Sequence, residues 1–113
     1  MIDYKPTLVT QLKTIALPVY YEMFVDSTTP IPCITYIETQ NDSLIEGDKL
    51  GYSTLSYQIK VWGNSVATLE EYAAVIDSKM RELGFIRFNA NELWIDGLGK
   101  KILKYRATAH EIF

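Results

Sequence analysis

The sequence predicts an α+β fold in which two amphipathic helices pack on one face of a mostly antiparallel sheet. Apolar residues recur at helical spacing in two segments, about residues 4–17 and 66–83. Segments typical of strands follow each helix in runs, and they do not alternate one by one with helices. The chain has 113 residues and no evident linker or repeat, so we expect residues 1–113 to form a single domain.

The first expected helix covers about residues 4–17. Leu8 and Leu12 lie four residues apart and would share one face of it. Asp3 is a candidate N-cap, because a short acidic side chain can accept from the first free backbone N–H groups. Pro18 ends the segment, since the residue before a proline avoids the α region.

The second expected helix, about residues 66–83, has the stronger pattern. Asn64, Ser65 or Thr68 is the expected N-cap. Gly84 is the expected C-terminal stop. Its apolar positions follow an alternating three- and four-residue spacing: Val66, Leu69, Ala73, Ile76, Met80 and Leu83.

Strands are expected wherever β-branched and aromatic residues gather or alternate with polar ones. A turn or a bulge is expected at residues 89–91, and a turn at residues 97–99. The expected strands are residues 19–25, 33–39, 52–62, 85–88, 92–95 and 101–113.

A long polar and acidic loop is expected over residues 40–51, between two strands. Hairpin loops usually have two to five residues, and a longer loop in a small domain usually has a function or is mobile. Apolar residues within a polar segment suit contacts with another protein. We therefore expect an interface formed by Asp42, Leu44, Ile45, Glu46, Asp48, Lys49, Leu50 and Tyr52.

The residue types needed for catalysis are scarce. The chain has one cysteine, Cys33, which is expected to be buried, and one histidine, His110, without an orienting carboxylate or nucleophile. Residues 97–101 (GLGKK) lack the second half of a phosphate loop. The carboxylates of residues 40–51 lack the spacing of a calcium loop. We therefore expect no enzyme, no cofactor and no metal site.

Charge and hydropathy limit the kinds of partner that the sequence predicts. The formal net charge is −3 at pH 7, without the basic field of a general nucleic-acid binder. The first residues lack the apolar segment of a signal peptide, and the apolar runs are too short to span a bilayer. A cytoplasmic origin and no membrane partner are therefore expected.

Eight tyrosines and two tryptophans are many for this length. Aromatic residues in strands usually lie in the core or in cross-strand pairs, but Tyr and Trp are also enriched at protein interfaces. Both interpretations stay open for the tyrosines on or beside the strands: Tyr20, Tyr21, Tyr36, Tyr52 and Tyr57.

Three phrases, with the order of the elements, suggest a family. They are PCITY at residues 32–36, YQIKVW at residues 57–62 and MRELGF at residues 80–85. Nearly the whole chain resembles the tail terminator, or tail-to-head joining protein, of siphophages that infect Gram-positive bacteria. The terminator of phage lambda is a more distant analogue.

The resemblance implies a virion structural protein at the head–tail junction, assembled in the host cytoplasm. Such proteins form a hexameric ring on the last ring of the tail tube, stop tube growth and present a surface to the head-connector protein. Phage DNA passes through the lumen without sequence-specific binding. The alternatives are another virion protein, either a head-closure or a tail-tube component, and a small ligand-binding or enzymatic α+β domain.

Overall fold

The computed structural model describes residues 3–22, 28–46 and 49–110. It confirms the expected α+β fold, with two helices and a five-stranded, mostly antiparallel sheet. In chain order the elements are α1 (Lys5–Lys13), β1 (Val19–Tyr21), β2 (Cys33–Glu46), β3 (Lys49–Gly63), α2 (Val66–Glu82), β4 (Ile86–Ile95) and β5 (Leu98–His110).

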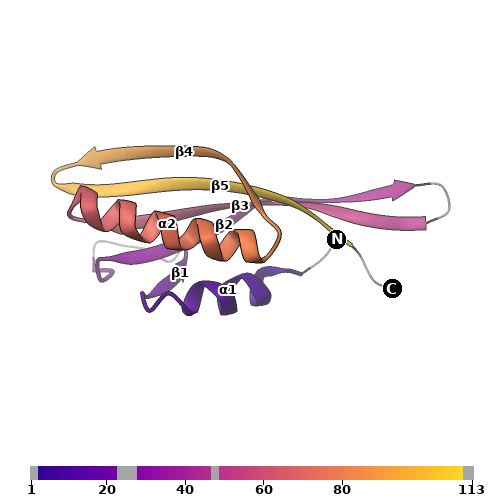
Figure 1. The fold of residues 1–113 in the computed structure, drawn as a ribbon, viewed down its shortest axis with the longest axis horizontal. Helices are drawn as coiled ribbons and strands as arrows, with labels where there is room; N and C mark the ends of the chain where they lie inside the picture. Colours follow the sequence, from indigo (N-terminus) through magenta and orange to yellow (C-terminus); the bar gives the residue numbers. More distant parts are fainter. Residues whose placement is uncertain (1–2, 23–27, 47–48, 111–113) are drawn as a thin grey trace.

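The strands lie in the order β1-β2-β3-β5-β4. Only the β1–β2 pair is parallel, and each other neighbouring pair is antiparallel. Both helices lie on the same face of the sheet, as Figure 1 shows. The opposite face therefore carries neither helix, and β4 forms one edge of the sheet.

The core lies between the helices and the sheet. The apolar stripe of α2, predicted from its spacing, meets alternating side chains of the two central strands. Fully buried members come from both helices and from three strands: Leu8, Leu12, Ile34, Leu55, Tyr57, Ile59, Val61, Leu69, Ile76, Met80 and Leu103.

The first helix is shorter than the sequence predicts, because it ends at Lys13. Its N-cap residue is Tyr4, without a side-chain hydrogen bond, so the prediction of an Asp3 cap is wrong. Beyond the helix, Ala16 has a φ of 66°, which turns the chain before Pro18. Pro18 contributes its carbonyl to the sheet, where it accepts from the N–H of Ile34 at 2.8 Å.

The second helix matches its prediction to within one residue. Ser65, one of three candidate caps, has an extended backbone, and its hydroxyl accepts from the N–H of Thr68 at 3.2 Å. Gly84 follows the helix with a φ of 90°, the left-handed conformation that glycine adopts most readily.

The expected loop over residues 40–51 is wrong. Backbone pairing between β2 and β3 continues as far as Glu46 and Lys49, with irregularities between Glu38 and Gln40 and between Leu44 and Ile45. We call this extension, residues 42–46 of β2 with residues 49–54 of β3, the arm. Figure 1 shows it projecting beyond both helices. A ribbon without a helix on either face needs no apolar face, so its polar sequence resembled a loop.

One signal in the sequence favoured this hairpin. Glu46 pairs with Lys49, so only Gly47 and Asp48 connect the strands. A Gly-Asp dipeptide between two strand segments is typical of a two-residue hairpin turn. Both residues lie outside the described part of the chain.

The C-terminal hairpin agrees with the sequence in outline. β4 is one continuous strand. Of the turn or bulge expected at residues 89–91, the structure has the bulge, as a register shift between Arg87 and Asn89. The turn at residues 96–97 has φ values of 52° for Asp96 and 80° for Gly97. β5 begins at Leu98, three residues earlier than predicted.

We expect Gly99→Ala to destabilise the protein. A Cβ at Gly99 would lie 2.7 Å from two ring carbons of Trp94, and the Trp94 indole N–H donates to Glu92 Oε2 at 2.9 Å. Displacing such a ring costs about 1–3 kcal/mol. Urea unfolding followed by tryptophan fluorescence measures the loss. Gly63→Ala is the control, since its added Cβ meets Leu69 and Thr68 only at 3.4 Å. Equal stability of the two variants would contradict the clash.

Candidate interaction surface

The helix-free face of the sheet carries the side chains that alternate with the core residues. On β3, Tyr57 and Ile59 are buried under the helices, so Gln58, Lys60 and Trp62 lie on the opposite side. By strand register, residues of β2 and β5 lie beside Lys60 and Trp62 on this same side. We call this side the open face; it includes Thr35, Gln40, Asp42, Ser56, Gln58, Lys60, Trp62, Lys100, Ile102, Lys104 and Arg106.

Trp62 is held at the centre of one end of the open face. Its indole N–H donates to the hydroxyl of Thr35 at 3.0 Å. The ammonium groups of Lys60 and Lys100 lie 5.9 and 5.1 Å from its ring centroid, within the range of cation–π attraction. Lys60 also forms an ion pair with Glu22. These contacts fix the position of Trp62, which is half-buried.

Positive charge gathers on the open face of a chain whose net charge is −3. Lys100, Lys104 and Arg106 project from β5 on this side. The guanidinium carbon of Arg106 lies 4.5 Å from the ring centroid of Phe88. Together with Lys60 these make four cations, whereas the described carboxylates placed on or beside this face are Glu22, Asp42 and Asp96. Charge is thus distributed unevenly over the protein.

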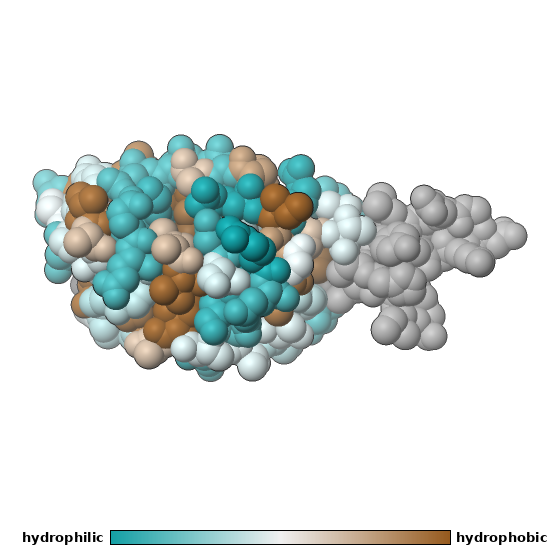
Figure 2. All heavy atoms as spheres, in the orientation of Figure 1, coloured by the Kyte–Doolittle hydropathy of each residue, from teal (hydrophilic) through white to brown (hydrophobic). Residues whose placement is uncertain are grey.

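Apolar surface gathers on β4. All ten of its residues are exposed. Of the seven large apolar residues that are exposed in the described part of the chain, five lie on this strand: Ile86, Phe88, Leu93, Trp94 and Ile95. An exposed edge strand with such residues is a ready template for another strand. On the side that carries the helices, by contrast, hydrophilic residues cover much of the surface, as Figure 2 shows.

An open hollow joins the β4 edge to the open face. Its volume is about 440 Å³, and its lining is mostly apolar, with one cation and one carboxylate at the rim. The lining residues are Trp62, Leu93, Ile95, Asp96, Leu98 and Lys100. The hollow is shallow, so it suits a side chain of another protein better than an enclosed small molecule.

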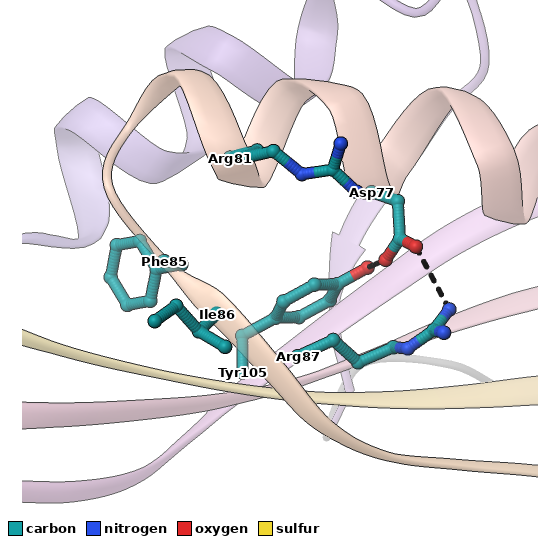
Figure 3. Close-up of a pocket in the computed structure, with 6 residues that line it drawn as sticks. All are labelled: Asp77, Arg81, Phe85, Ile86, Arg87 and Tyr105. Carbon is teal, nitrogen blue, oxygen red and sulfur yellow. Dashed lines mark hydrogen bonds and ion pairs between the residues drawn. The ribbon is translucent and has the colours of Figure 1, made fainter.

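A second hollow, of about 260 Å³, lies between α2 and the start of β4 (Figure 3). The buried hydroxyl of Tyr105 donates to Asp77 Oδ1 at 2.5 Å, and Arg87 donates to Asp77 Oδ2 at 2.9 Å. Burial, with the hydrogen bond to Asp77, raises the pKa of Tyr105 above its ordinary value, so the phenol keeps its proton at neutral pH. These polar groups satisfy one another and join helix to sheet, which is a structural role.

We expect the Asp77–Tyr105 contact to be visible in a double-mutant cycle. Asp77→Ala leaves the hydroxyl of Tyr105, a residue only 1% exposed, without its acceptor and costs about 1–3 kcal/mol. Tyr105→Phe removes the hydroxyl and should cost less. With both changes the loss falls below the sum, because no buried donor is left unpaired. Urea unfolding of the four proteins measures the coupling. Strict additivity would mean that the contact contributes nothing.

The predicted interface residues form the arm together. Asp42 is exposed on β2 and accepts from the side-chain amide of Gln40 at 2.7 Å. The others pair across the hairpin by backbone register, as Leu44 with Tyr52, Ile45 with Leu50 and Glu46 with Lys49. Their side chains, and Asp48 as a whole, lie outside the described part of the structure, so their contact role stays a prediction.

The two residues considered for chemistry occupy different places. Cys33 is buried, as expected, and burial raises the pKa of its thiol to about 11. His110 ends β5, where it pairs with Tyr52. Among the side chains that the structure describes, no three His, Cys, Asp or Glu come together as metal ligands. Neither described helix is long and apolar enough to cross a bilayer.

Neither the β4 edge nor the contacts of Trp62 with Lys60 and Lys100 were predicted from the sequence. The apolar residues of β4 were visible as strand material, but nothing local indicates that this strand lies at the edge of the sheet. Comparison with known proteins adds no assignment, since no protein-family model matches the sequence and no curated protein matches it either.

Proposed function

We propose that the protein is a phage or prophage virion component that caps the tail tube as an oligomeric ring and forms the interface for head–tail joining. The observation that supports this most is the β4 edge, where five of seven exposed large apolar residues gather on one unpaired strand edge in the described chain. A surface of this kind favours a protein partner. The resemblance of residues 32–36, 57–62 and 80–85 to tail terminators supports the tail tube as that partner.

The arrangement of the surfaces suits a ring. Subunits in a ring make heterologous contacts, in which one side of a subunit meets a different side of the next. The β4 edge and the arm supply two unlike surfaces on opposite sides of the sheet. In this proposal the ring has six subunits, contacts the tail-tube protein on one side and the head-connector or head-closure protein on the other, and lets DNA through its lumen without sequence-specific contacts.

An enzymatic function has less support. In the hollow beside α2, Asp77 is occupied as the acceptor of both Tyr105 and Arg87. The hollow beside Trp62 is open and mostly apolar. A catalytic pocket instead needs polar groups that converge on a substrate. A binding role for other macromolecules therefore remains the better interpretation.

Removing the gene from its phage or prophage tests the proposal. We expect electron micrographs of the resulting lysate to contain tails longer than wild type and without heads, because nothing stops the tube. Restoring the gene should restore normal length. Tails of normal length that lack heads would assign the protein to joining or head closure. Particles of normal form and number would contradict any role in the virion.

A further inference from the structure

The sheet has a second open edge besides β4. β1 pairs with β2 only at residues 34–36. Beyond Tyr36, no described strand lies on the outer side of β2, although β2 continues to Glu46. We call residues 37–46 the β2 edge. The subunit thus presents two open edges on opposite sides of one sheet, and we propose that the β4 edge of one copy pairs with the β2 edge of the next copy.

Strand direction fits this pairing. Each neighbouring pair from β2 through β3 and β5 to β4 is antiparallel, so β2 runs opposite to β4. When a second copy continues the sheet with the same orientation, its β2 lies beside the first copy's β4 and the two strands are antiparallel. Antiparallel pairing is the arrangement of most of this sheet and the more stable one per residue.

Edge length fits it as well. β4 has ten residues, and the β2 edge, residues 37–46, has the same length. Full pairing would form roughly ten backbone hydrogen bonds over about 34 Å. At about one hydrogen bond per 100–200 Å², this corresponds to an interface of roughly 1,000–2,000 Å², which is the size of a specific protein contact.

The charges of the two edges differ. The β2 edge contains three carboxylates, Glu38, Asp42 and Glu46, and no lysine or arginine. β4 itself carries one arginine, Arg87, which is paired with Asp77, and one carboxylate, Glu92, so it has no net charge. Lys104 and Arg106 lie on the adjoining β5. This distribution disfavours the pairing of two β2 edges, which would repel each other, and leaves the pairing of unlike edges free of such repulsion.

The inference deepens the proposed function and rests on it for closure into a ring. Pairing of β4 with β4 of a second copy would be isologous and would stop at a dimer. Pairing of β4 with the β2 edge leaves one free edge of each kind after every addition, so the chain of subunits continues until it closes. A continued sheet also gives the exposed apolar residues of β4 cross-strand neighbours along its full length.

Disulfide formation between introduced cysteines tests the contact. Ala90→Cys and Asn91→Cys place thiols on opposite faces of β4, and Thr39→Cys and Asp42→Cys place them on the β2 edge; all four positions are exposed. Native Cys33 is buried and serves as background in every variant. After mild oxidation we expect ladders of covalent oligomers on non-reducing gels from double variants with one cysteine on each edge. Single variants should stay unlinked. Val66→Cys with Asp42→Cys is the collision control, since Val66 is exposed on α2.

Three other outcomes would overturn the inference, and each leads to a different conclusion. Dimers from Ala90→Cys or Asn91→Cys alone would show that β4 pairs with itself. Rings detected by mass photometry without ladders in any double variant would place the ring contact elsewhere, while the proposed function stands. Monomers that show no ladder and do not bind isolated tail tubes would remove both the contact and the proposed function.

Discussion

Replacing Leu93 and Ile95 together by glutamate is expected to abolish capping of tail tubes while the subunit stays folded. The two side chains are 48% and 68% exposed in the single subunit, so the fold does not depend on their burial. In the proposed assembly they lie beside the side chains of a neighbouring strand, which partly cover them. Burying two unpaired carboxylates there would cost several kcal/mol, enough to reduce binding by orders of magnitude.

Complementation of the deleted gene measures this effect as phage titre and as tail length. Val66→Glu is the matched control, because Val66 is 55% exposed but lies on the helix side, away from β4. We expect the control to restore titre and the double variant to leave overlong, headless tails. Urea unfolding of both proteins checks that each is folded. Full restoration by the double variant would exclude β4 from the assembly contact.

Replacing Ile76 by alanine is expected to cause the largest loss of stability among the changes considered. Its side chain is fully buried where α2 packs on β3 and β5. Removing such a side chain costs about 2–5 kcal/mol, through lost burial and the cavity left behind. Domains of this size are stable by only about 5–15 kcal/mol, so a large share of the total would be lost.

The free energy of unfolding in urea measures the loss. Val66→Ala on the same helix is the control, because Val66 is largely exposed and its truncation should change stability by less than about 0.5 kcal/mol. A similar small effect for both variants would mean that α2 does not pack on the sheet as described.

The sequence predicted what local patterns determine. The alternating spacing predicted the buried face of α2 from Leu69 to Met80, and Gly84 marked its end, whereas Val66, the first residue of the pattern, is exposed. Alternation along residues 52–62 likewise predicted a half-buried strand, and Ile59 and Val61 on one side of β3 are buried. Tyr57, which the sequence left open between core and interface, is buried on the same side. Each of these patterns follows from one element packing against one core, which a single segment can reveal.

The arm and the first helix show where local patterns fail. The arm extends beyond the helices, so its sequence lacks a regular alternation of apolar and polar residues, and only Gly47-Asp48 indicated a hairpin. The first helix stops at Lys13 although Ile15 remains buried, because the chain turns through Ala16 before β1. A buried residue just beyond a helix continues its apolar spacing and makes the helix look longer.

The candidate site depends on strand order, which no local pattern determines. β5 follows β4 in sequence but lies between β3 and β4 in the sheet. That insertion makes β4 the outer strand and exposes Leu93 and Ile95. It also brings Lys100 beside Trp62, from segments far apart in the sequence. The site could be recognised only after the sheet was assembled.

The most direct test of the account is the mass of the purified protein together with isolated tail tubes. We predict that mass photometry or electron microscopy will find the protein at one end of each tube as a closed ring of a fixed number of subunits, and that a tube with this ring no longer elongates. Protein that stays monomeric in the presence of tubes, or that binds along their length without stopping growth, would contradict the account.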